Sequence, residues 1–187
     1  ITYGDWSSDV CSSDLGADTI RGGAGADTIE GGAGDDSIEG GADADVINAG
    51  SGANEITDAG VGADEITHNA ASSTVAIAVT GSDVVTLKAS ESGATVSSAD
   101  GVNTTVDASG SSAGVLMNGG GGNDSYVGGT GADTIRGGAG ADTIEGGAGD
   151  DSIEGGADAD VINAGSGANE ITDAGVGADE ITHNAAS

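Results

Sequence analysis

Four consecutive nine-residue segments decide the fold of this chain: GGAGADTIE at 22–30, GGAGDDSIE at 31–39, GGADADVIN at 40–48 and AGSGANEIT at 49–57. In each segment an isoleucine follows an Asp or Asn by two positions. After one extra residue, Asp58, the pattern continues with AGVGADEIT at 59–67. A fixed short period indicates a solenoid, in which each repeat packs only on its neighbours.

The pattern occurs a second time, because residues 16–72 recur without a change as residues 131–187, an offset of 115 positions (131 minus 16). The second block begins earlier, with GGGGNDSYV at 119–127 and GGTGADTIR at 128–136. Identity over this length is typical of recent DNA duplication. We therefore expect a longer parent protein built from tandem 115-residue units. A fragment joined to itself by an assembly error is the alternative.

Each repeat divides into a six-residue turn and a three-residue strand. Glycine in the turn permits positive φ angles and close approach of two backbones. In a strand triplet such as Thr28-Ile29-Glu30, the middle side chain faces one side and its neighbours face the other. One residue per repeat should therefore point inward. The predicted core consists of Ile20, Ile29, Ile38, Ile47, Ile56, Ile66, Tyr126, Ile135, Ile144, Ile153, Ile162, Ile171 and Ile181.

This core is too thin to fold the repeats by itself. One buried isoleucine contributes about 2 kcal/mol, whereas ordering nine residues costs ~1–2 kcal/mol for each of them. The sequence supplies carboxylates at fixed spacing among backbone carbonyls, which together are oxygen ligands for a hard cation such as Ca²⁺. The pattern contains no His or Cys, which argues against zinc or copper.

The repeats resemble the RTX nonapeptide, GGxGxDxUx, of calcium-binding parallel β-roll proteins. The resemblance covers roughly residues 16–67 and 119–182. It implies an all-β fold, a parallel β-roll or β-solenoid in which two nonapeptides make one coil and several Ca²⁺ ions lie between turns stacked 18 residues apart. Carried over, the side-chain ligands are Asp18, Asp27, Asp36, Asp45, Asn54, Asp64, Asp124, Asp133, Asp142, Asp151, Asp160, Asn169 and Asp179. The backbone-carbonyl ligands are Gly23, Gly25, Gly32, Gly34, Gly41, Gly120, Gly122, Gly129, Gly131, Gly138, Gly140, Gly147, Gly149 and Gly156.

Some repeats depart from the family pattern. Asp43 and Asp158 replace the fourth-position glycine, so strain is expected in those turns. Asn54 and Asn169 offer a neutral oxygen in place of a carboxylate. We therefore expect calcium affinity to fall toward the C-terminal end of each block.

The chain divides into four parts: residues 1–15, a first block at 16–69, an intervening segment at 70–118 and a second block at 119–187. Residues 5–15 read DWSSDVCSSDL, which resembles the translation of a sequencing adapter. We expect residues 1–15 to be such an artefact and disordered; a genuine Ser/Asp-rich linker is the alternative. The intervening segment shows strand patterns at 74–80, 84–87, 95–96, 104–106 and 114–117, with a turn at 81–83. Irregular solenoid coils are expected there, or else a small separate β-domain.

Composition limits the possible partners. Only three Lys and Arg residues stand against 32 Asp and Glu, giving a net charge of −29, so a nucleic-acid binder is not expected. No apolar run reaches the length of a membrane span. Without Ca²⁺ the chain should be largely disordered through self-repulsion, and with millimolar extracellular Ca²⁺ it should fold.

The sequence favours a structural function over catalysis, because it contains neither HExxH nor GxSxG and its two His form no dyad. The resemblance implies a secreted bacterial protein, exported by type I secretion machinery and located outside the cell or on its surface. The first hypothesis is a calcium-stiffened segment of a large adhesin or S-layer type protein with a surface or matrix target. The second is a C-terminal folding and secretion module of a protease, lipase or pore-forming toxin. The third is a disordered acidic linker.

Overall fold

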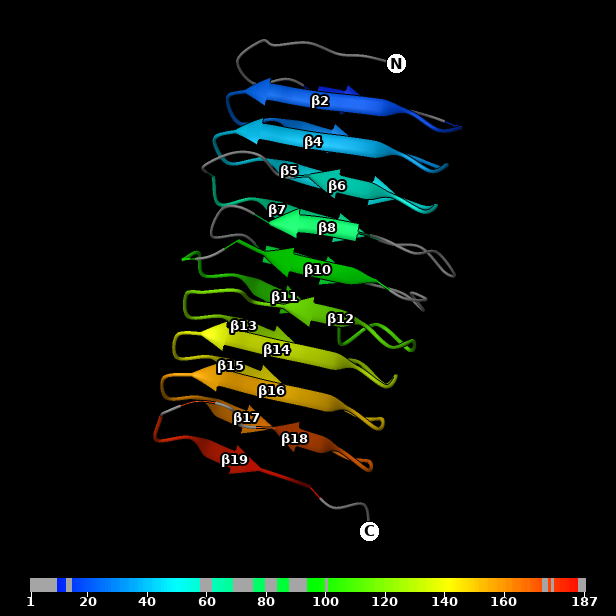
Figure 1. Ribbon diagram of the computed structural model, residues 1–187. Helices are drawn as coiled ribbons and strands as arrows, with labels where there is room; N and C mark the ends of the chain where they lie inside the picture. Colours follow the sequence, from blue (N-terminus) through cyan, green and yellow to red (C-terminus); the bar gives the residue numbers. More distant parts are fainter. Residues whose placement is uncertain are drawn as a thin grey trace.

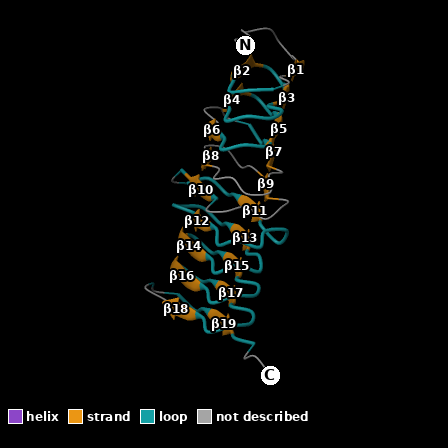
Figure 2. Cartoon of the chain, turned by 90° about the vertical axis from the view of Figure 1, so that its right-hand side faces the viewer, coloured by secondary structure: helices purple, strands orange, loops and turns teal. Residues whose placement is uncertain are grey.

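The chain folds into two parallel β-sheets that face each other along one elongated roll (Figure 1). The computed structural model describes residues 10–12, 15–57, 62–68, 76–79, 84–87, 94–99, 101–172, 175 and 177–184. Every named strand pair is parallel, and consecutive strands alternate between the two sheets (Figure 2). The expected all-β solenoid is confirmed.

One sheet contains the ten odd-numbered strands. They are β1 (Val10–Ser12), β3 (Thr28–Glu30), β5 (Val46–Gly50), β7 (Glu65–His68), β9 (Val84–Leu87), β11 (Thr105–Asp107), β13 (Ser125–Val127), β15 (Thr143–Glu145), β17 (Val161–Asn163) and β19 (Glu180–Thr182). The other sheet contains the nine even-numbered strands. They are β2 (Thr19–Ala24), β4 (Ser37–Ala42), β6 (Glu55–Thr57), β8 (Ala76–Val79), β10 (Thr95–Ser98), β12 (Leu116–Asn118), β14 (Thr134–Ala139), β16 (Ser152–Ala157) and β18 (Glu170–Thr172).

The register follows the nine-residue repeat, because two repeats complete one coil. Ile20 lies opposite Ile38 in the neighbouring coil, and Ile38 lies opposite Ile56. In the other sheet Ile47 pairs with Ile66, 19 residues away, because the extra residue at 58 lengthens that coil. The strand register absorbs the insertion, so the isoleucine column is continuous. Residues 58 and 173 themselves lie outside the described residues.

The core is a double column of isoleucines between the two sheets. Eleven of the thirteen predicted core residues are buried, each with 1 % or less of its surface exposed: Ile20, Ile29, Ile38, Ile47, Ile56, Ile66, Tyr126, Ile135, Ile144, Ile153 and Ile162. The other two differ from the prediction. Ile171 is only partly buried, and Ile181 is 46 % exposed. Both lie on the last described strands of their sheets, β18 and β19, so no further described strand covers them.

The N-terminal segment is more ordered than its composition suggests. Val10–Ser12 forms β1 and pairs with β3, with Cys11 opposite Ile29, whereas residues 1–15 were expected to be disordered. The sequence Asp9-Val10-Cys11 places an apolar residue two positions after an Asp, 18 residues before Asp27-Thr28-Ile29. This match to the repeat gives a physical reason for the pairing. The adapter origin of the segment stays a prediction.

The intervening segment continues both sheets. Strands β8 to β12 connect the first block to the second by parallel pairing, from β6 and β7 on one side to β13 and β14 on the other. Val96, Val106 and Met117 are buried and extend the isoleucine columns. The predicted turn at 81–83 lies outside the described residues.

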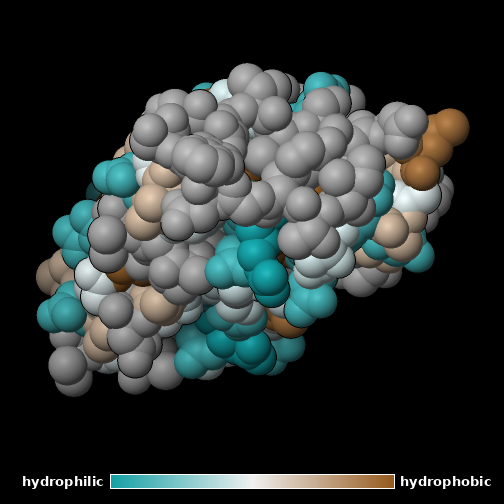
Figure 3. Space-filling model, turned by 90° about the horizontal axis from the view of Figure 1, so that it is seen from above, coloured by the Kyte–Doolittle hydropathy of each residue, from teal (hydrophilic) through white to brown (hydrophobic). Residues whose placement is uncertain are grey.

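The surface of the roll is predominantly polar. Viewed from above the N-terminal end, hydrophilic side chains extend down the visible side, with small hydrophobic patches among them (Figure 3). Arg21 forms an ion pair with Glu39 at 2.7 Å, and Arg136 pairs with Glu154 at 3.4 Å. Within the described parts of the chain, no helix is long and apolar enough to cross a membrane.

Candidate metal-binding turns

The aspartates of the repeats form two ladders, one along each row of turns. In one ladder the backbone N–H of Asp18 donates to Asp36 Oδ1 at 3.0 Å, and the N–H of Asp36 donates to Asn54 Oδ1 at 2.9 Å. In the other, the N–H of Asp27 donates to Asp45 Oδ1 at 2.9 Å. Each carboxylate therefore uses one oxygen to bind the preceding coil.

The second block repeats these ladders. The backbone N–H groups of Asp124, Asp133, Asp142 and Asp151 donate to Oδ1 of Asp142, Asp151, Asp160 and Asn169 at 2.8–2.9 Å. The N–H of Asp160 reaches Asp179 Oδ1 at 2.9 Å, over 19 residues. The predicted side-chain ligands thus lie in two continuous rows, at the spacing expected from the repeat.

The other carboxylate oxygen is the atom with ligand capacity. Oδ2 of Asp36, Asp45, Asp142 and Asp151 is buried and accepts no hydrogen bond. A buried anionic oxygen without a donor is costly, so such an atom in a regular structure indicates a bound ion or water. The four atoms recur at equivalent places in the repeat, which points to a repeated cation site.

A backbone carbonyl oxygen converges on the same place. Beside Gly31, the point that a Cβ atom would occupy lies 3.0 Å from Asp36 Oδ2 and 2.6 Å from the carbonyl oxygen of Ala49 in the next coil. The same arrangement recurs beside Gly146. A carboxylate oxygen and a carbonyl oxygen from two coils are the hard ligands that Ca²⁺ prefers.

These first-position carbonyls are not among the predicted ligands, which are second- and fourth-position glycines. Several second-position carbonyls are engaged elsewhere: the Gly32 oxygen accepts from Ser51 N–H at 2.8 Å, and the Gly120 oxygen from Ala139 N–H at 3.0 Å. The sequence does carry a signal for the first position. Only Gly or Ala occurs there in the nonapeptides from 22 to 67, and a side chain would enter the space beside Oδ2.

The turn glycines adopt backbone conformations that other residues avoid. Gly32 and Gly34 have φ values of 93° and 136°, and the equivalent glycines of most repeats are also positive. Asp43 and Asp158, which replace the fourth-position glycine, have φ values of 76° and 78°. These two aspartates hold the left-handed conformation that was expected to strain their turns.

One turn differs from the others. Gly129 and Gly131, both predicted carbonyl ligands, lack the positive φ of the equivalent glycines. The N–H of Gly129 points to its own turn's carboxylate and donates to Asp133 Oδ2 at 2.8 Å. The coil beneath this turn belongs to the intervening segment, where the Gly129 backbone packs on the Ser111 carbonyl. The irregular coil below therefore changes the turn above it.

Burial weakens the acidity of the ladder carboxyls. Desolvation, with the charge of neighbouring carboxylates, raises the pKa of Asp45 and Asp142 to about 6. The same causes raise the pKa of Asp36 and Asp151. The folded chain therefore stabilises a proton or a cation at these oxygens over a bare negative charge.

Acids outside the ladders face solvent. Asp35 accepts a hydrogen bond from the N–H of Ala53 at 2.8 Å, and Asp150 makes the same bond to Ala168. Both lie on the exposed side of the turns, as expected. Among the described residues, no group of three or more His, Cys, Asp or Glu side chains is placed to hold a metal. A cation between the turns would therefore depend on backbone carbonyls for much of its coordination.

Comparison with known proteins supports this geometry. A family model described as the RTX calcium-binding nonapeptide repeat matches residues 21–56, 118–153 and 137–171. These stretches are RTX calcium-binding repeats. The matched stretches contain the Asp36, Asp45, Asp142 and Asp151 turns, whose buried oxygens fit Ca²⁺. No curated protein and no solved structure gives a match to the chain.

Proposed function

We propose that this RTX chain is a calcium-folding region of a secreted bacterial protein and a structural or adhesive segment of a large tandem-repeat surface protein. The observation that carries the proposal is the repeated buried Oδ2 atom, which faces a carbonyl oxygen of the next coil. A bound Ca²⁺ supplies the positive charge that these oxygens require.

Charge couples calcium binding to folding. The chain carries a net charge of −29, and its ladders bring carboxylates into rows that repel one another when ionised. Because the ladders exist only in the stacked coils, calcium binding contributes directly to the free energy of folding. Low cytosolic and millimolar extracellular Ca²⁺ would keep the chain unfolded before export through type I secretion machinery and folded afterwards.

The roll suits a mechanical function better than a catalytic one. Its described residues form stacked coils from one end to the other (Figure 1), and the identical blocks allow tandem units to extend the same roll. Long arrays of such units place binding surfaces far from the cell and present them in many copies. The alternative, a folding and secretion module of an enzyme or toxin, requires a catalytic or pore-forming domain in the same gene.

Titration of Ca²⁺ into a matched pair of variants tests the binding site. Asp36→Ala removes a buried ladder carboxylate, whereas Asp35→Ala removes an exposed carboxylate one residue away. Isothermal titration calorimetry should show fewer or weaker calcium sites in the first variant and an unchanged isotherm in the second. An equal loss in both would mean that calcium is held by overall charge and not by these turns.

A single long sequencing read across the parent gene tests the biological setting. Many near-identical 115-residue units would support the surface protein. An upstream protease, lipase or toxin domain would favour the folding and secretion module.

A further inference from the structure

The intervening segment replaces the ladder aspartates with uncharged residues. Thr104 N–H donates to Asp124 Oδ1 at 2.7 Å, and Val115 N–H donates to Asp133 Oδ1 at 2.8 Å. In the repeats this place in the ladder belongs to an Asp or Asn. Thr104 and Val115 are 1 % and 2 % exposed, and Ala94, one coil further, is 0 % exposed. The ladders thus continue through the middle of the roll without carboxylates.

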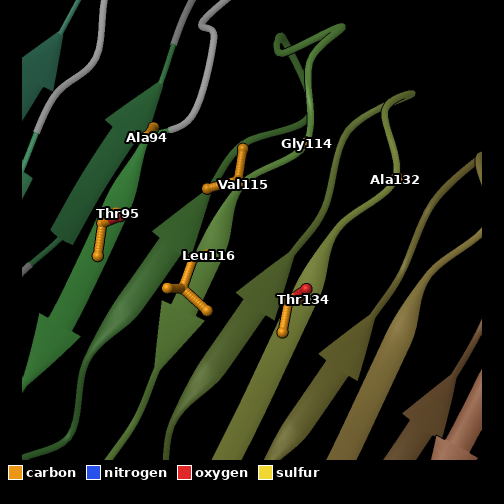
Figure 4. A pocket seen from close by; sticks show the side chains of 7 residues that line it. All are labelled: Ala94, Thr95, Gly114, Val115, Leu116, Ala132 and Thr134. Carbon is orange, nitrogen blue, oxygen red and sulfur yellow. The ribbon is translucent and has the colours of Figure 1, made fainter.

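Asp133, at the start of the second block, has both carboxylate oxygens satisfied by the chain itself. Oδ1 accepts from Val115 and Oδ2 accepts from the N–H of Gly129 at 2.8 Å. The Gly129 and Gly131 backbone has turned away from the left-handed conformation of the other repeats. Figure 4 shows that the loops carrying Gly114 and Ala132 lie side by side beneath the shallow pocket of this region. The turn has closed on its own donor.

Asp124 faces a tyrosine hydroxyl where the other repeats have only an isoleucine methyl group. The point that a Cβ atom on Gly119 would occupy lies 2.8 Å from the Tyr126 hydroxyl oxygen and also meets Asp124 Oδ2 and the Gly137 carbonyl oxygen. Tyr126 is 1 % exposed, and its hydroxyl is directed at Asp124 and Ser98. Burial and the Asp124 charge raise the pKa of Tyr126, so the hydroxyl keeps its proton.

We propose that Asp124 and Asp133 hold no calcium, and that residues 94–136 form a metal-independent segment on which the calcium-dependent coils of the second block stack. The hydroxyl of Tyr126 and the N–H of Gly129 take the place of the cation at these two turns. Val96, Val106, Met117 and Tyr126 supply a continuous buried core between them. The proposal rests on the calcium-dependent folding proposed above for the remaining repeats.

The arrangement gives folding a defined origin. Nucleating a first coil is the costly step in a solenoid, because a single repeat buries little on its own. A segment that folds without metal presents β13 and β14 as ready edges for β15 and β16. Calcium then needs only to add coils to an existing edge.

Hydrogen exchange measured by mass spectrometry on the full chain tests the proposal. Peptides unique to residues 101–130 report the metal-independent segment, and peptides shared by residues 22–57 and 137–172 report the nonapeptide coils. In EDTA we expect the unique peptides to exchange about tenfold or more slowly than the shared ones. Addition of Ca²⁺ should slow the shared peptides strongly and the unique peptides little.

Two outcomes of this experiment separate the two proposals. Unique peptides that gain protection only with Ca²⁺ would overturn the metal-independent segment and leave calcium-dependent folding intact. Shared peptides that do not respond to Ca²⁺ would remove the proposed function, while protection of the unique peptides in EDTA would still support the segment.

A pair of variants tests the reason for the metal independence. Thr104→Asp places a carboxylate in the ladder below Asp124, whereas Thr105→Asp adds the same charge to an exposed position. In Thr104→Asp, protection of residues 101–130 should be lost in EDTA and regained in Ca²⁺; Thr105→Asp should behave as the unmodified chain. Protection of Thr104→Asp that persists in EDTA, or that Ca²⁺ fails to restore, would contradict the assignment of Thr104 to a ligand place.

Discussion

Acid should stabilise the calcium-free roll, in contrast to most proteins. Burial and neighbouring carboxylates raise the pKa of Asp45 and Asp142 to about 6, from the ordinary value of 3.8. Because the folded pKa is the higher one, the folded chain binds more protons than the unfolded chain between these values. The added stability is fully present below the unfolded pKa and is lost as the pH rises through about 6.

The size of the effect follows from the shift. One pKa unit corresponds to about 1.4 kcal/mol, so each of the two carboxyls contributes about 3 kcal/mol. This is a large part of the roughly 5–15 kcal/mol that stabilises an ordinary domain. In Ca²⁺ the sign reverses, because the ligands bind the cation only in their ionised form and protons compete with it.

Circular dichroism between about pH 7.5 and pH 5 measures the effect. In EDTA the β-sheet signal should grow as the pH falls, whereas in saturating Ca²⁺ it should stay constant or weaken. The lower limit keeps the sample above the isoelectric point of about 4.1. An Asp45→Asn, Asp142→Asn double variant should lose much of the response in EDTA. Acid that unfolds the calcium-free chain, or the same response in both media, would refute the assignment of buried, repelling carboxyls.

Two further predictions concern packing, and urea unfolding in saturating Ca²⁺ measures both. Ile38→Ala should cost about 2–5 kcal/mol because it leaves a cavity in the core column, whereas Ile181→Ala, at a side chain that is 46 % exposed, should cost about 1 kcal/mol or less; equal losses would contradict the core described. Gly41→Ala should cost about 3 kcal/mol or more because its Cβ would strike the Gly23 carbonyl in the adjacent coil. Gly101→Ala, which also has a positive φ but meets nothing within 4 Å, should cost about 1–2 kcal/mol, and an equal cost at both glycines would argue against close coil stacking.

The sequence was sufficient to predict the architecture because the repeat specifies it locally. Each nonapeptide places one apolar residue inward and one acid in the turn, so the ladders of Asp36 and Asp142 could be read from spacing alone. The extra residue at 58 changed the spacing from 18 to 19 without breaking the isoleucine column. Strand pairing tolerates such an insertion when it falls in a turn.

The parts that the sequence did not predict depend on contacts between coils. The first-position carbonyl of Ala49 lies beside Asp36 Oδ2 only because the coils stack, and the pattern itself gives no distances. The altered turn at Gly129 follows from the irregular coil beneath it, although its own sequence, GGTGADTIR, matches the repeat. Exposure of Ile181 likewise reflects its position on a terminal strand and not its place in the repeat.

The central claim is that calcium holds these coils together, and far-UV circular dichroism at neutral pH in millimolar Ca²⁺ and in EDTA tests it most directly. The described fold predicts a strong β-sheet spectrum in Ca²⁺, and in EDTA only the smaller signal of the metal-independent segment against a background of disordered chain. Return of Ca²⁺ in excess of the chelator should restore the full spectrum. The same spectrum in both media would contradict the account.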